Sequence, residues 1–364
     1  MLLTAGQIKA ACGEMPFIFR AGVWKPRTSP HTFQGVGEEG LEWLKEVKER
    51  FGIAIATEVA TPEHVQKALA AGIDYLWIGA RSSANPMVVE AIAKAIADRD
   101  AVRPRCCKTA NAVGPSQSDC KIKGILIKNP VNEDAGLWLG NIERLEKVGV
   151  PVIAVHRGCN HQPCWAMAHK VRLARPDIPM LLDPSHMSGE AAKIPGLMQK
   201  IEELGLDGAM IEVHCCPEQA LSDAKQQVEP KVLSEMIPSG VTRPLLDEFW
   251  RTPSPKHASE RVSSPKEIEV KDGNTELNWL RAEIDELDEK LWDTIGARMD
   301  VSRRIGEWKK AHGMAPLQPE RYEMIVERLK TPLNPPMEGG RMLRTEFKLA
   351  LWELIHEESL RQQE

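Results

Sequence analysis

Short apolar runs alternate with longer amphipathic segments along the first two thirds of the chain. The apolar runs are hydrophobic at nearly every position, which is the pattern of strands buried on both faces. They are Phe17–Arg20, Ile53–Glu58, Tyr75–Ile78, Ile125–Lys128, Val152–Val155, Met180–Leu182 and Ala209–His214. The segments between them, and Met1–Cys12 ahead of the first, have helical spacing. Strands that alternate with helices predict a parallel α/β sheet covered on both sides.

Charged residues follow these runs at their C-terminal ends. Met180–Leu182 gives way at once to Asp183, Pro184, Ser185 and His186. The other strand ends carry Arg20, Glu58, Arg81, Lys128, His156, Arg157 and Glu212. Each one alone is more simply a solvated loop charge, but in a closed barrel all these ends meet at one mouth. Cations beside acids and imidazoles therefore predict a pocket for an anionic substrate next to a metal.

A second pattern begins after a stretch rich in proline, serine and charge. Apolar residues recur at helical spacing from Glu276 to about His312, and two further helices are predicted at Pro319–Leu329 and Leu343–Gln363. We expect domains at residues 1–237 and 276–364, joined by a linker at 238–275. The long helix alone is equally well explained as a coiled-coil dimerisation module. Residues 99–124 interrupt the first pattern and are interpreted as a surface loop.

Composition narrows the classes of partner. A chain of 364 residues is long enough for two domains, and its net charge of -5 argues against a nucleic-acid surface. No apolar run is long enough to span a membrane, and no basic-then-apolar signal opens the chain, so we expect a cytoplasmic protein. The 8 cysteines show no C-x-x-C spacing and are expected to be reduced thiols.

The strand-end motifs resemble those of the 3-deoxy-D-arabino-heptulosonate 7-phosphate (DAHP) synthase family. The matching strings, in order, are Phe19–Gly22, Lys25–Thr28, Ile78–Arg81, Ile127–Pro130, His156–Gly158, Asp183–His186, Glu212–His214 and Ala220–Asp223. The resemblance implies a (β/α)8 TIM barrel that condenses phosphoenolpyruvate with erythrose 4-phosphate and needs a divalent metal: Mn, Fe, Co or Zn.

Roles carry over residue by residue from this resemblance. It implies that His186, Glu212 and Asp223 are metal ligands. It also implies phosphoenolpyruvate-binding residues, which are Lys25, Arg81, Lys128, Arg157 and Arg20. Arg27 and Thr28 would bind the erythrose 4-phosphate end, and Lys25 would deliver a proton. A metal that polarises the aldehyde oxygen, and cations that hold two repelling anions in order, suit this condensation.

Two departures from the family pattern stand out. The family's first strand ends in a Gly-Pro-Cys-Ser turn whose cysteine is the fourth metal ligand, and nothing before Phe17 matches it. The resemblance therefore implies a barrel without its first strand and a metal sphere without its fourth ligand. The loop after His156–Gly158 is also shorter than the family's usual loop.

The C-terminal helices resemble the all-helical chorismate mutase family over Glu276 to the C-terminus. The strings Leu280–Asp285 and Ile355–Ser359 carry the likeness. It implies a homodimer in which Arg281 reaches into the partner's pocket. Arg281 and Arg298 would bind the carboxylates of chorismate, Lys309 and Gln363 would face its ether oxygen, and Arg321 and Ser359 would complete the cage. A pericyclic rearrangement needs only such positioning and charge stabilisation.

The two resemblances together predict a fusion of synthase and mutase. An alternative makes the barrel a catalytically impaired scaffold or regulatory partner for a working mutase. In a third hypothesis the helical domain serves only for dimerisation.

Overall fold

The computed structural model describes residues 1–13, 15–27, 29–98, 122–236, 274–330 and 343–363. They divide into two compact units, Met1–Glu283 and Ile284–Glu364. The expected domain boundaries stay predictions, because most of the expected linker, like Thr28 and most of the 99–124 segment, lies outside the described residues. No helix in the described ranges is long and apolar enough to cross a membrane.

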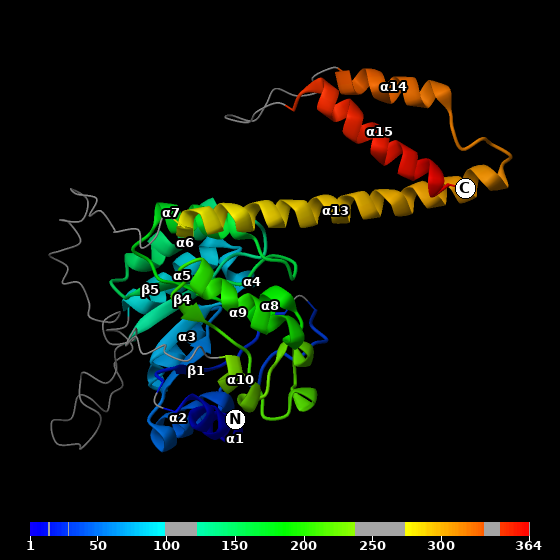
Figure 1. The fold of residues 1–364 in the computed structure, drawn as a ribbon. Coiled ribbons are helices and arrows are strands. Elements are labelled where there is room, and N and C mark those ends of the chain that lie inside the picture. Colours follow the sequence, from blue (N-terminus) through cyan, green and yellow to red (C-terminus); the bar gives the residue numbers. More distant parts are fainter. Residues whose placement is uncertain (14, 28, 99–121, 237–273, 331–342, 364) are drawn as a thin grey trace, which may run out of the picture. The chain divides into compact units, whose positions relative to one another are not determined.

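A parallel seven-stranded sheet forms the centre of the first unit (Figure 1). Its strands are β1 Ile18–Ala21, β2 Ala54–Glu58, β3 Tyr75–Ile78, β4 Gly124–Lys128, β5 Val152–His156, β6 Met180–Leu182 and β7 Gly208–Ala209. Each strand pairs with the next in sequence, with Arg20 opposite Ala56 and Lys128 opposite Val155. Among the described strands no pairing joins β7 to β1. The predicted α/β alternation is therefore confirmed as a curled half-barrel.

Helices cover the outer face of this sheet. They are α1 Leu2–Cys12, α2 Glu39–Phe51, α3 Pro62–Ala70, α4 Ala80–Ser83, α5 Pro86–Ala97, α6 Ala135–Glu146, α7 Trp165–Ala174, α8 Pro184–Ser188, α9 Ile194–Glu203 and α10 Pro230–Met236. Thr61, Asn85 and Asp134 begin α3, α5 and α6 by accepting a hydrogen bond from the backbone of the first turn. Proline follows Thr61 and Asn85, where its missing N–H costs nothing.

Two apolar clusters show which way each strand residue points. One fills the space between sheet and helices. The other lies on the inner face and contains Ala56, Tyr75, Trp77, Leu126, Ile153, Val155 and Met210. Side chains alternate along a strand, so the inner positions at the C-terminal ends are polar. They are Arg20, Glu58, Lys128, Arg157, Asp183 and Glu212. Strand parity thus places charge from six strands around one rim.

The last part of the first unit is less regular than its sequence predicts. The expected strand Ala209–His214 is regular only at Gly208–Ala209, with an isolated bridge between Val213 and Val228. The expected helix from Pro217 consists of two 3-10 turns, η4 Pro217–Gln219 and η5 Ala224–Gln226; a third, η3 Ala191–Lys193, precedes α9. Asp223 between them has φ 55°, which breaks a right-handed helix.

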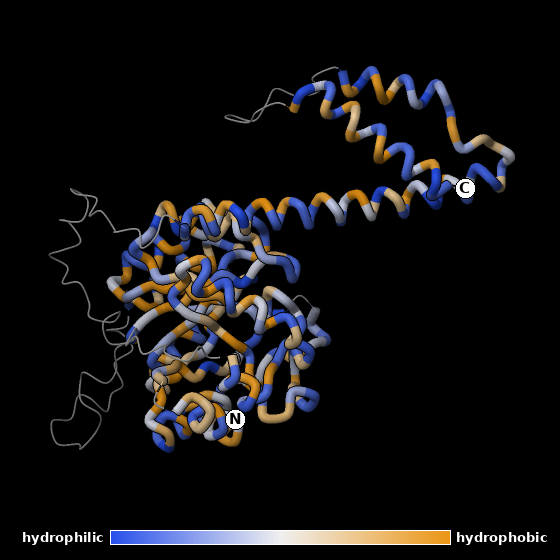
Figure 2. The backbone as a smooth tube through the Cα atoms, in the orientation of Figure 1, coloured by the Kyte–Doolittle hydropathy of each residue, from blue (hydrophilic) through white to orange (hydrophobic). Residues whose placement is uncertain are grey.

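The second unit is helical, as predicted. It contains the part of α13 (Asn274–Ala311) from Ile284 onward, α14 (Pro319–Lys330) and α15 (Thr345–Arg361) (Figure 1). Hydrophobic and hydrophilic residues alternate along α13 (Figure 2). Several large apolar side chains of α13 are exposed, at Ile284, Leu287, Leu291, Trp292, Val301, Ile305 and Trp308. A soluble helix seldom leaves such a stripe without a partner.

Candidate active sites

Asp183 connects the predicted metal ligand His186 to the predicted substrate cation Lys128. Its fully buried carboxylate forms an ion pair with Lys128, with 2.7 Å between Nζ and Oδ2, and its Oδ1 accepts from His186 Nδ1 at 3.1 Å. Burial alone would raise the pKa of the Asp183 carboxyl, but His186 and Lys128 hold it well below its usual range. Because Nδ1 donates to Asp183, the His186 Nε2 lone pair is available on the other side, 3.9 Å from Glu212 Oε1.

Glu212 is bound from three directions. Arg20 Nη2 lies 3.4 Å from its Oε1, and Gln226 Nε2 donates to its Oε2 at 2.8 Å. Its backbone N–H donates to Ser185 Oγ at 2.9 Å. Burial would raise the pKa of Glu212, but His186, Arg20 and Lys25 lower it overall. The side chain is therefore a carboxylate, with both oxygens fixed at the rim.

Asp223 lies among the cations expected to bind substrate. Lys25 Nζ is 2.5 Å from Oδ2 and also donates to Ser222 Oγ, while Arg27 donates to both oxygens, at 3.3 and 3.2 Å. Burial opposes ionisation, but hydrogen bonds from Lys25 and Arg27 hold the pKa of Asp223 well below its usual range. This carboxylate thus neutralises two cations in the present arrangement.

Arg157 and Arg81 form a second cationic area of the rim. Burial lowers the pKa of Arg157, and the charge of Arg81 lowers it further. Asn129 holds the Arg157 backbone, since its Oδ1 accepts from Arg157 N at 2.7 Å and its Nδ2 donates to Gly158 O at 3.1 Å. Two neighbouring guanidinium groups, one of them half-buried, favour an anion with several charges.

His156 occupies the same strand end but does not join the rim. It follows the inner residue Val155, so its ring points outward, 6.3 Å from the Trp138 ring and 5.3 Å from the Trp165 ring. Burial lowers its pKa to about 3. The expectation that His156 contributes to the pocket is therefore wrong, because side-chain parity on β5 places it among the helices.

Several residues that hold this site together were given no individual role by the sequence, although three of them lie in its strand-end motifs. They are Glu58, Asp183, Ser185 and Gln226. Burial raises the pKa of Glu58, whose Oε1 lies so close to Gly79 that a Cβ there would meet it at 2.1 Å. The signal for Asp183 was present in the sequence, since it falls on the inner-face parity of β6. Ser185 and Gln226 carried no comparable signal.

The donor atoms of the rim suit a divalent metal in part. His186 offers a ring nitrogen fixed by an aspartate on its other side, and Glu212 offers a carboxylate, a combination that borderline metals accept. Asp223 is paired with Lys25 and Arg27 instead. Within the described residues, the three ligand atoms that gather within 4.8 Å of one another belong to a different group, Glu133, Cys159 and Cys164.

The second unit brings four of the expected mutase residues into two pairs. Arg298 Nη1 donates to Ser359 Oγ and lies 3.4 Å from Ile355 O. Lys309 Nζ donates to Gln363 Oε1 at 3.2 Å. Gly306 on α13 permits the close approach of the chain after α15, because a Cβ there would meet the Gln363 Cα at 2.6 Å.

Arg321 and Arg281 are placed differently from these four. Arg321 is exposed on α14, and Arg281 is an exposed residue of the first unit. Arg281 and Arg298 are separated along α13 by about 26 Å at 1.5 Å per residue. One chain therefore cannot bring both side chains to the same small dicarboxylate.

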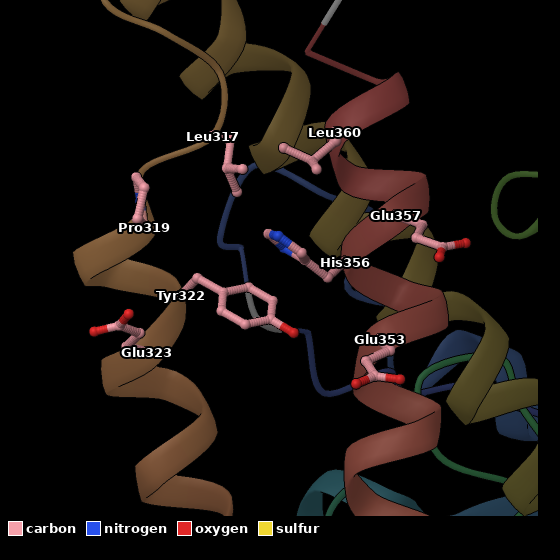
Figure 3. Close-up of a pocket in the computed structure, with 8 residues that line it drawn as sticks. All are labelled: Leu317, Pro319, Tyr322, Glu323, Glu353, His356, Glu357 and Leu360. Carbon is pink, nitrogen blue, oxygen red and sulfur yellow. The ribbon is translucent and has the colours of Figure 1, made fainter.

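A pocket of about 430 Å³ lies between α14 and α15 (Figure 3). Tyr322 and His356 face each other across it with ring centroids 5.2 Å apart. Its lining includes Glu323, Glu353 and Glu357. Burial first, and then Arg298 and Lys309, lower the pKa of His356, so the pocket adjoins the cationic pairs. Carboxylates in this lining disfavour a dianion in the pocket.

Comparison with known proteins agrees with both resemblances. Residues 1–97 and 139–241 match the DAHP synthetase I family, and residues 280–364 match chorismate mutase type II. A phospho-2-dehydro-3-deoxyheptonate aldolase from Thermotoga maritima is 27% identical over 227 residues, which are 60% of this chain and 59% of that protein. A 2-dehydro-3-deoxyphosphooctonate aldolase from Helicobacter acinonychis is 26% identical over 239 residues, covering 61% of this chain and 82% of the relative.

The crystal structure of the Thermotoga maritima DAHP synthase shares the fold. It superposes with a TM-score of 0.51 at 24% identity, covering 65% of this chain and 61% of that one. This chain thus spans about three fifths of the length of the Thermotoga enzyme. The matched family models cover both units, and the chain belongs to the DAHP synthetase I family with a C-terminal chorismate mutase type II domain.

Proposed function

We propose that the first unit condenses phosphoenolpyruvate with erythrose 4-phosphate to DAHP. The observation that carries this proposal is the Lys128–Asp183–His186 chain at the rim, next to Glu212 and Arg20. It combines substrate-binding cations with metal-binding donors in one connected network. The two substrates repel each other as anions, so their approach depends on such cations.

Each cation has a proposed place. Lys128, Arg157, Arg81 and Arg20 bind phosphoenolpyruvate, and Arg27 with Thr28 binds the phosphate of the aldose. Lys25 Nζ donates to Ser222 and Asp223, between the cations assigned to phosphoenolpyruvate and those assigned to the aldose phosphate. We assign proton delivery to this lysine. Asp223 is the counterion of Lys25 and Arg27 in the structure. A substrate phosphate can replace it there as the counterion.

His186, Glu212 and Asp223 are the residues that would hold the divalent metal. The ion would supply Lewis-acid polarisation of the aldehyde oxygen. Asp183 fixes the His186 ring so that Nε2 faces the metal position, which is the usual role of a carboxylate behind a histidine ligand.

The test compares Lys128, the last residue of β4, with Lys123, which directly precedes the strand. Consumption of phosphoenolpyruvate is measured with and without erythrose 4-phosphate, for the wild type, Lys128→Met and Lys123→Met. Lys123 lies away from the rim, and its Nζ is 3.3 Å from Asp74 Oδ1. Its variant therefore controls for the loss of a charge. We expect aldose-dependent consumption that only Lys128→Met abolishes. A five-carbon aldose phosphate in parallel separates heptonate from octonate synthesis, since phosphoenolpyruvate adds three carbons.

The alternative, a barrel that serves as scaffold for the mutase, has one observation in its favour. The expected metal ligand Asp223 already neutralises Lys25 and Arg27. Absence of aldose-dependent phosphoenolpyruvate consumption in metal-supplemented wild type, with mutase activity intact, would support the scaffold and contradict the synthase proposal.

For the second unit we propose rearrangement of chorismate to prephenate. Arg298, fixed by Ser359 and Ile355 O, binds a carboxylate, and Lys309 with Gln363 faces the ether oxygen. Negative charge grows on that oxygen as the C–O bond breaks, and a fixed ammonium stabilises it. Arg321 completes the cage as an exposed cation on α14.

The separation of Arg281 from Arg298 supports a homodimer in which each cage takes Arg281 from the partner chain. The exposed apolar stripe of α13 supplies the surface. The test mixes Arg281→Ala chains with Arg298→Ala chains after refolding together. In an interlocked dimer, mixed pairs contain one intact cage, and about a quarter of wild-type activity returns. Cages built from one chain would give no recovery.

A further inference from the structure

Two cysteines and a glutamate meet beside the rim without belonging to it. Cys159 and Cys164 lie in the loop between β5 and α7, and Glu133 lies in the loop between β4 and α6. One ligand atom from each residue lies within 4.8 Å of the other two, and Cys164 Sγ is 3.5 Å from Glu133 Oε1. Both cysteines are buried and present as thiols.

The loop that carries the cysteines has a defined backbone. Cys159 and Gln162 exchange two backbone hydrogen bonds of 2.9 Å. Asn160 and His161 between them both have positive φ, 50° and 61°, as in a tight two-residue turn. Gly158 has φ 69°, and a Cβ there would meet Gln162 O at 2.1 Å. This geometry fixes both cysteines before any ligand binds.

A buried amide lies beside Cys159 and connects the two loops. Asn129 is fully buried, and its Nδ2 lies 3.8 Å from Cys159 Sγ. The same amide holds Gly158 O and Pro130 O, so it links the two loops that supply the three residues.

The spacing and the atoms fit zinc. Cys-x4-Cys falls within the usual range for paired zinc ligands, and Zn–S bonds of about 2.3 Å place tetrahedral ligands roughly 3.5–3.8 Å apart. The Cys164–Glu133 distance already has this value. Glu133 is exposed, so an ion can enter from solvent and a water can take the fourth position.

From this geometry we infer that Cys159, Cys164 and Glu133 form a zinc site that joins the β4–α6 and β5–α7 loops. The site is separate from the metal position at His186 and Glu212, since it shares no ligand with it. Its effect is to brace the backbone of Arg157, which is two residues from Cys159 and is held by the same Asn129.

Cobalt substitution tests this site on the full chain. Co²⁺ alone is titrated into chelator-treated protein, and the thiolate-to-cobalt charge-transfer band is followed. The rim offers nitrogen and oxygen donors, so a band reports sulfur ligands. We expect a band that is complete once two equivalents have been added, enough for this site and the rim, that disappears in Cys159→Ser and Cys164→Ser, and that shifts in Glu133→Gln. The matched control, Cys215→Ser/Cys216→Ser, removes two other cysteines of the first unit and should keep the band.

Two further measurements cover variants that fail to fold. Zinc X-ray absorption on the wild type at two equivalents, enough for this site and the rim, should show sulfur neighbours. Hydrogen exchange in residues 157–164 should slow when Zn²⁺ is added. A wild type without a charge-transfer band, a band retained in Cys159→Ser/Cys164→Ser, or a zinc shell of nitrogen and oxygen only would overturn the inference. So would a Cys159–Cys164 disulfide in protein purified without oxidant.

Discussion

Lys128 and Asp183 form a buried ion pair, with 2.7 Å between Nζ and Oδ2 and side-chain exposures of 6% and 0%. They lie at the C-terminal ends of β4 and β6, and these two strands flank β5 in the sheet. Asp183 also holds His186. Removing one member of a buried pair leaves an uncompensated charge, which commonly costs about 3–5 kcal/mol of stability. Asp183 therefore connects a cation proposed to bind substrate with a histidine proposed to bind metal, and its loss should destabilise the rim.

Asp183→Asn should weaken metal binding by roughly 10–100-fold, the usual effect of losing a partner behind a histidine ligand. The amide keeps the size of the side chain but cannot neutralise Lys128 or hold the His186 tautomer. Competitive chelator titration of Mn²⁺ measures the change. Glu190→Gln, at an exposed acid just after α8, is the control and should bind metal as the wild type does. Equal affinities for the wild type and Asp183→Asn would contradict the role given to Asp183.

Lys309→Ala should lower kcat/KM for chorismate by roughly 10²–10³-fold, the usual effect of losing one fixed donor at a developing oxyanion. The loss should appear mainly in kcat, because the ether oxygen gains charge only in the transition state. Lys310→Ala controls for charge on an exposed neighbour. Synthase activity of both variants should match the wild type. A Lys309→Ala enzyme with wild-type kcat would remove this residue from the mechanism.

Two glycines of α13 offer a matched pair of substitutions. Gly306→Ala should abolish most mutase activity, because its Cβ would meet the Gln363 Cα at 2.6 Å and displace the amide that Lys309 contacts. Gly296→Ala has nothing within 4 Å and should stabilise the helix by about 0.5–1 kcal/mol. Chorismate kinetics and thermal unfolding of both variants decide this. Unchanged mutase kinetics in Gly306→Ala would show that Gln363 does not depend on this close approach.

The sequence predicted the strand-helix alternation and the three C-terminal helices because both depend on local periodicity. It also indicated which strand ends carry charge. It could not show that Asp223 pairs with Lys25 and Arg27, since these residues are about 200 positions apart and meet only through the sheet. His156 was misplaced because a strand end was considered without its parity. Thr28 lies outside the described residues, and its role stays a prediction.

His156 makes the stability of the first unit depend on pH. Its ring is fully buried, neither ring nitrogen has a hydrogen-bond partner among the described residues, and its pKa falls to about 3. In the unfolded chain this ring has a pKa near 6.5, whereas in the folded chain its pKa is about 3. Between these two pH values the unfolded state therefore binds more protons than the folded state. Stability is therefore complete above pH 6.5 and falls by about 1.4 kcal/mol per pH unit as the pH drops from 6.5 towards 3.

His156→Phe keeps an aromatic ring between Trp138 and Trp165 and removes the titration. Urea unfolding at pH 8 and pH 5.5 should therefore show a loss for the wild type that exceeds the loss for His156→Phe by about 1.4 kcal/mol. His31→Phe, at an exposed position, should follow the wild type. Identical pH dependence in the wild type and His156→Phe would mean that the folded protein protonates this ring, with a partner supplied from solvent.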